Sequence, residues 1–147
     1  GKIVETDASC PTLTFNAIAR HQSMLVRTRV ASNKSPWLMH MNVGDIHTVA
    51  ISHGEGRFVA SDEVLAQLRA NGQIATQYVD ETGTPGMDLD VNPNGSLLAI
   101  EGITSPDGHV LGKMGHTERA GAGLYKNTFG NTYQPLFEGG VDYFRTK

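Results

Sequence analysis

Apolar and polar side chains alternate over several short stretches of the chain, a pattern typical of strands that bury one face. The clearest stretch is Ser23–Val30, which is also rich in β-branched residues. The mostly apolar run Ser96–Ile103 is expected to be buried. Further strands are predicted, from similar runs, at His47–Ser52, Gly56–Ala60, Gln73–Val79 and Val110–Met114.

Two stretches have the spacing of helices instead. Ser61 has the chemistry of a helix N-cap, acidic residues follow it, and apolar residues then recur at helical spacing until Gly72. This predicts a short helix over Ser61–Asn71. A second helix is expected over Gln134–Tyr143, with Pro135 in its first turn. The 17 glycines among 147 residues favour many turns and short elements over a helical bundle.

Composition limits the classes of protein that fit. The length suits one domain, and 39% hydrophobic against 18% charged residues is enough to build a core. A net charge of -3 without a basic run disfavours a nucleic-acid partner, and no apolar stretch approaches the ~20 residues that span a membrane. The single cysteine, Cys10, excludes an internal disulfide and a multi-cysteine metal site, so we expect a cytoplasmic protein.

The sharpest chemical grouping is His116-Thr117-Glu118, which directly follows the predicted strand Val110–Met114 and Gly115. A carboxylate two residues from an imidazole can orient a base and stabilise its cationic form, because a turn brings the two groups within hydrogen-bonding range. The alternative is a surface turn with a polar pair, since short strings of this kind often occur by chance.

Other candidate centres are weaker. His47 and His53 would share a strand face but lie about 20 Å apart, so we expect no metal site. Cys10 precedes Pro11, which lacks the backbone N–H that would help to hold an oxyanion, and it is therefore a poor nucleophile. A serine hydrolase that uses His116 would need G-x-S-x-G, which no serine here supplies.

Five segments carry a family resemblance when they are taken together in order and spacing. They are Arg20–Ser23, Ile51–Arg57, Asn92–Ser96, Ala99–Ile103 and Gly115–Arg119. Over nearly the whole chain, to about Phe144, they resemble the glutaminase domain of the phosphoribosylformylglycinamidine synthases, in particular the large single-chain type. One departure is Thr117, which stands where the family commonly has proline, a residue without a chemical role.

The resemblance implies a class I glutamine amidotransferase, in which a Cys-His-Glu triad hydrolyses glutamine. The ammonia passes to a synthetase portion, which uses ATP and Mg²⁺ to convert formylglycinamide ribonucleotide to its amidine in purine biosynthesis. His116 and Glu118 match the family's catalytic histidine and glutamate. The loop with His53, Gly54 and Glu55 matches the segment beside bound glutamine; alternatively, it is a glycine-hinged turn in which His53 is a structural hydrogen-bonding group.

The resemblance also implies an incomplete domain. The family's nucleophile lies in a G-x-C-x-G segment before the matched region, and residues 1–147 contain no such segment. We therefore expect an α/β fold, the strand-rich C-terminal portion of a flavodoxin-like amidotransferase domain with mixed and antiparallel strands, without the leading β-α units or the nucleophile elbow. The chain alone is predicted to be inactive and to need the rest of the synthase.

Loss of the leading units has a further expected consequence for association. Runs such as Val49–Ile51 and Leu97–Ile100 would lie uncovered, so the isolated chain would pair with itself or require its partner segment. A β-rich binding or interaction module without catalytic activity is the alternative function, because an isolated fragment can do no more than associate.

Overall fold

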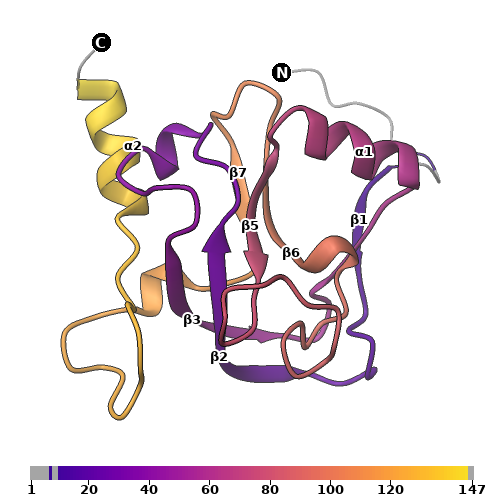
Figure 1. The fold of residues 1–147 in the computed structure, drawn as a ribbon, viewed down its shortest axis with the longest axis horizontal. Coiled ribbons are helices and arrows are strands. Elements are labelled where there is room, and N and C mark those ends of the chain that lie inside the picture. The colour runs from indigo at the N-terminus through magenta and orange to yellow at the C-terminus, as the bar shows by residue number, and fades with distance from the viewer. Residues whose placement is uncertain (1–6, 8–9, 146–147) are drawn as a thin grey trace.

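A five-stranded antiparallel sheet forms the centre of the computed structural model, which describes residue 7 and residues 10–145 (Figure 1). The strand order is β3-β2-β5-β6-β7. A separate two-stranded antiparallel ribbon pairs β1 (Thr12–Thr14) with β4 (Arg57–Val59). The sheet strands are β2 (Gln22–Val30), β3 (Ile46–His53), β5 (Ile74–Tyr78), β6 (Ile100–Thr104) and β7 (Leu111–Lys113).

The strands predicted from alternation are confirmed, whereas β1 was not predicted because three residues are too few to show a period. Mixed strand directions were expected, but every ladder among the described strands is antiparallel. The one parallel pairing in the described ranges is the isolated bridge between His47 and Asn131. The described part of the chain is thus a strand-rich α/β fold.

Helix α1 (Asp62–Ala70) begins where its sequence predicts. The Ser61 hydroxyl accepts a hydrogen bond from the Val64 N–H at 3.3 Å, which satisfies one of the amide groups left open at a helix start. Leu65 and Leu68 face the core, where they pack in one cluster with side chains from β4, β5 and β6. The helix therefore covers one end of the sheet.

Helix α2 (Leu136–Arg145) lies on the other side of the sheet from α1, against the 3-10 turn η1 (Pro36–Leu38) (Figure 1). Two glycines make the close approach possible. A Cβ atom on Gly139 would lie 2.8 Å from a backbone oxygen of η1, and one on Gly140 would lie 2.5 Å from the Trp37 ring. Among the described residues, no helix is long and apolar enough to cross a membrane.

The apolar runs expected to lie uncovered are instead mostly buried. Val49 and Ile51 are 3% and 1% exposed and pack in a core cluster with Tyr78. Ile100 is equally buried, in the cluster that α1 covers. The expectation of exposure was wrong because β4, α1 and the loop before β6 fold back over the sheet. The exposed large apolar residues on α2 are Phe137, Val141 and Phe144.

Candidate functional site

His116 and Glu118 meet in a tight turn directly after β7. Met114 and Gly115 follow the strand, and His116 is the N-cap of the 3-10 turn η3 (Thr117–Arg119). The turn brings His116 Nδ1 to 2.7 Å from Glu118 Oε1. The separation expected for an oriented imidazole is therefore confirmed, and the backbone N–H of His116 is itself held by the Ala50 carbonyl of β3 at 2.8 Å.

The charges at this pair favour an ionised carboxylate. Burial acts to raise the pKa of Glu118, but the hydrogen bond with His116 and the charge of Arg119 outweigh it, so the pKa lies below its ordinary value. Arg119 Nε lies 3.9 Å from the same carboxylate oxygen. An ionised carboxylate accepts the Nδ1 proton, which leaves Nε2 of the neutral ring as the nitrogen that can receive a proton.

A cavity of about 430 Å³ opens beside this pair. Its walls come from β7, from η3 and from the start of α2, and they include Trp37, Met114 and Phe137 as well as His116 and Glu118. The His116 side chain is 29% exposed and that of Glu118 is 57% exposed. The dyad can therefore be reached by a ligand, and it stands in a partly apolar hollow.

His53 lies at the end of β3, close enough to His116 for the charges of the two rings to interact. Its Nε2 lies 2.7 Å from the Asn94 side-chain nitrogen, which also donates to the Tyr78 hydroxyl at 2.9 Å. Burial lowers the pKa of His53; the hydrogen bond with Asn94 acts to raise it, and the charges of His116 and His21 act to lower it. Because an amide nitrogen donates, His53 Nε2 is the acceptor in the bond with Asn94.

The loop that follows His53 is fixed by Asn16. The Asn16 side chain donates to the His53 carbonyl at 2.8 Å and accepts from the Gly56 N–H at 2.9 Å, and its backbone N–H donates to the Gly54 carbonyl at 2.9 Å. The Glu55 side chain points into solvent. The structure thus brings His53 near His116, and a role of this loop in binding glutamine stays a prediction.

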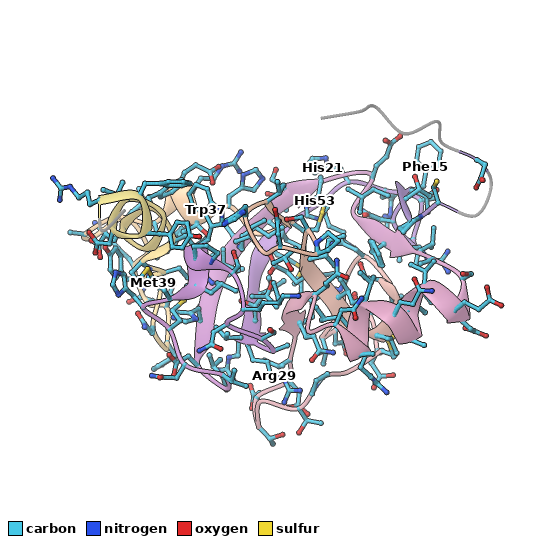
Figure 2. The ribbon with its side chains drawn as sticks, turned by 90° about the horizontal axis from the view of Figure 1, so that it is seen from above. Phe15, His21, Arg29, Trp37, Met39 and His53 are labelled. Carbon is cyan, nitrogen blue, oxygen red and sulfur yellow. The ribbon has the colours of Figure 1, made fainter. Side chains whose placement is uncertain are left out.

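Two other features, a buried histidine and a second hollow, lie apart from the dyad. His47 is buried at the far end of β3 from His53, and burial lowers its pKa. Within residue 7 and residues 10–145, no cluster of three His, Cys, Asp or Glu side chains could hold a metal ion. A hollow of about 500 Å³, lined in part by Arg29 and Arg69, contains neither dyad residue, and Figure 2 shows Arg29 on the opposite side of the molecule from His21 and His53.

Several residues of this region were not singled out as candidates from the sequence. Asn94 lies in one of the segments that carry the resemblance, but its contact with His53 spans 41 positions. Glu101 forms a buried ion pair with Lys113, with a distance of 3.1 Å between Oε1 and Nζ. The sequence signal that could have identified Glu101 was its position as the one carboxylate inside the apolar run Ser96–Ile103, because a buried charge requires a partner.

Comparison with known proteins gives consistent relatives. Residues 1–144 match the model of the CobB/CobQ-like glutamine amidotransferase domain. Phosphoribosylformylglycinamidine synthase subunit PurQ of Methanocaldococcus jannaschii is 34% identical over 140 residues, which are 95% of this chain and 59% of that protein. The PurQ subunit of a Synechocystis species is 43% identical over 105 residues, 71% of this chain and 46% of that protein.

A solved structure has the same fold. It is that of PurLQS from Thermotoga maritima, which matches with a TM-score of 0.67 and 25% identity over 92% of this chain and 53% of that chain. The chain thus spans roughly half the length of these relatives. Because the family match extends over residues 1–144, the chain belongs to the family of CobB/CobQ-like glutamine amidotransferase domains.

Proposed function

We propose that this chain is part of the glutaminase domain of a phosphoribosylformylglycinamidine synthase, in which it helps to supply ammonia from glutamine for the ATP-dependent amidation of formylglycinamide ribonucleotide in purine biosynthesis. The observation that carries this proposal is the 2.7 Å hydrogen bond between His116 and Glu118 beside a cavity, in a chain of an amidotransferase family. The five segments that resemble the large single-chain synthases support that type.

The proposed reaction uses His116 as base and then as acid. Nε2 takes the proton of a cysteine thiol, and the thiolate attacks the carboxamide carbon of glutamine. His116 returns the proton to the departing ammonia, which leaves a glutamyl thioester. The same nitrogen then deprotonates a water molecule, whose oxygen attacks the thioester carbon; the C–S bond breaks, glutamate is released, and the cysteine sulfur takes the proton back from His116. Glu118 holds the ring and stabilises its cationic form, as the third member of such triads does.

The nucleophile in this proposal is a cysteine outside this sequence. Cys10 is the one cysteine of the sequence, and its sulfur hydrogen-bonds within its own turn to Asp7 at 3.9 Å. The following residue, Pro11, lines a hollow other than the one beside His116. β7 is the edge strand beside the dyad, with no described strand on its outer side, so a further segment can approach there. Without that segment, we propose that the chain is inactive.

The remaining parts of the proposal concern ligands and partners. We propose that the loop of His53, Gly54 and Glu55 contacts glutamine, supported by the electrostatic interaction of His53 with His116. ATP and Mg²⁺ would bind in the synthetase portion of the synthase, outside this chain. The similarity to a structure of PurLQS supports association with that portion. A single cysteine suits a cytoplasmic location.

The nitrogen donor tests the proposal. In the complete protein that carries this sequence, with any co-purifying subunits, glutamine and ammonium are compared as donors for amidation of formylglycinamide ribonucleotide with ATP. We expect both to support the reaction, with one glutamate released per amidine formed from glutamine. If ammonium supports the reaction and glutamine does not, the chain is the binding module without catalytic activity.

A further inference from the structure

A buried ion pair lies directly behind the turn that carries His116. Glu101 on β6 and Lys113 at the end of β7 join across the two neighbouring strands, with 3.1 Å between Oε1 and Nζ. The Glu101 side chain is fully buried and that of Lys113 is 10% exposed. The second carboxylate oxygen of Glu101 accepts from the Thr76 hydroxyl. Lys113 is among the residues that line the cavity beside His116, whereas Glu101 is not.

The ion pair holds both polar groups of Gly115, the residue before His116. The Gly115 N–H donates to Glu101 Oε1 at 2.5 Å, and the Gly115 carbonyl accepts from Lys113 Nζ at 2.8 Å. The fit is close, because a Cβ atom on Gly115 would lie 2.8 Å from Oε1 and 2.9 Å from Nζ. The backbone that enters His116 is therefore fixed at two points by opposite charges.

Lys113 is also linked, through Gln134, to the residue after His116. Its ammonium group lies 3.5 Å from Gln134 Oε1, and the Thr117 hydroxyl donates to the same oxygen at 2.7 Å. The residues on both sides of His116 are thus linked to one buried ammonium group, Gly115 directly through its carbonyl and Thr117 through the Gln134 side chain. The imidazole itself stays free of this network and bonds to Glu118.

We propose that Glu101 and Lys113 are positioning residues, which aim the His116 imidazole by fixing the Gly115 backbone before it and, through Gln134, the Thr117 side chain after it. This inference rests on the proposed function of His116. A buried ion pair is rarely better for stability than an apolar pair of similar volume, so packing does not account for its presence. Fixed hydrogen bonds matter in a catalytic site, where a displacement of about 1 Å can lower a rate by about 100-fold.

The test compares Glu101→Gln, Lys113→Met and the double variant in the complete protein. Each single substitution leaves a buried charged or polar group without its partner, so we expect a lower melting temperature and a lower kcat for glutamine hydrolysis. The double variant removes both charges and should recover much of the melting temperature. Because nothing then holds the Gly115 carbonyl, its kcat should stay about 10- to 100-fold low, with less change in KM. Recovery of kcat together with melting temperature would overturn the proposal.

A matched control lies where the residue before β5 meets β6, one of the two strands that carry the ion pair. Gln73 is buried and donates to the Thr104 carbonyl at 2.8 Å, away from His116. Gln73→Met should lower the melting temperature and leave kcat unchanged. If it lowers kcat as much as the Glu101 and Lys113 substitutions do, their loss of kcat reflects general stability, and the positioning inference is overturned. The variant His116→Ala separates the proposed function from the positioning inference. If His116→Ala is inactive while the Glu101→Gln, Lys113→Met double variant has full kcat, only the positioning inference fails. If His116→Ala keeps its activity, the proposed function fails.

Discussion

Replacement of His116 by alanine is expected to lower glutamine hydrolysis in the complete protein by about 10²- to 10⁴-fold, the range typical of a general acid–base group. The reason is that one nitrogen, Nε2, is proposed to move the proton in both halves of the reaction, while Nδ1 is fixed by Glu118. Amidation with ammonium should be unaffected, because it needs no glutaminase step. Steady-state rates with each nitrogen donor measure both effects.

His109 provides the matched control. It also bonds to a carboxylate two residues away, with 3.1 Å between Nδ1 and Asp107 Oδ2, but its Nε2 is occupied by the Tyr143 hydroxyl at 2.8 Å. His109→Ala should therefore leave the glutamine-dependent rate within about twofold of the original, as expected away from the site. If His109→Ala lowers the glutamine-dependent rate as much as His116→Ala does, the loss is not specific to the His116–Glu118 dyad. The proposed role of His116 would then be wrong.

Replacement of Lys113 by methionine is expected to reverse the way in which stability depends on pH. Burial acts to raise the pKa of Glu101, but Lys113 and the hydrogen bonds from Thr76 and Gly115 outweigh it, so the folded pKa lies below the ordinary 4.5. The ionised group thus stabilises the fold above the unfolded pKa, and this contribution is lost as pH falls through the folded pKa.

Without the lysine, burial dominates and the folded pKa of Glu101 rises above its unfolded value. The variant should then be about 3–5 kcal/mol less stable than the original protein near pH 7, and the deficit should narrow as pH falls and Glu101 takes up a proton. Thermal unfolding at pH 7.5 and pH 5, with the exposed Lys126→Met as control, measures this deficit. If the loss of stability in Lys113→Met is the same at both pH values, or larger at pH 5, Lys113 is not the group that keeps Glu101 ionised.

Local features of the fold could be predicted because their causes lie close together in the sequence. The Ser61 cap and the apolar spacing of α1 need only one short segment, and the alternation over β2 directly reports its buried face. Strand order could not be predicted in this way, because β2 pairs with both β3 and β5 through contacts between distant residues. The burial of Val49–Ile51 was missed for the same reason, since the covering segments are remote.

The same distinction holds for the candidate site: contacts between residues close in the sequence could be predicted, and contacts between distant residues could not. His116 and Glu118 are two residues apart, so the turn that joins them could be inferred from their spacing. The partners that fix the surroundings come from other strands and loops: Asn94 reaches His53, and Glu101 reaches Gly115. A single sequence shows that Glu101 needs a partner but does not identify Lys113 as that partner.

In the proposed function, the His116–Glu118 dyad serves a cysteine outside this sequence. Incubation of the complete protein with a reactive glutamine analogue, followed by mass spectrometry of its peptides, tests this most directly. We expect one adduct, on a cysteine other than Cys10, whose formation slows strongly in His116→Ala. An adduct on Cys10, or one that forms at the same rate without His116, would contradict it.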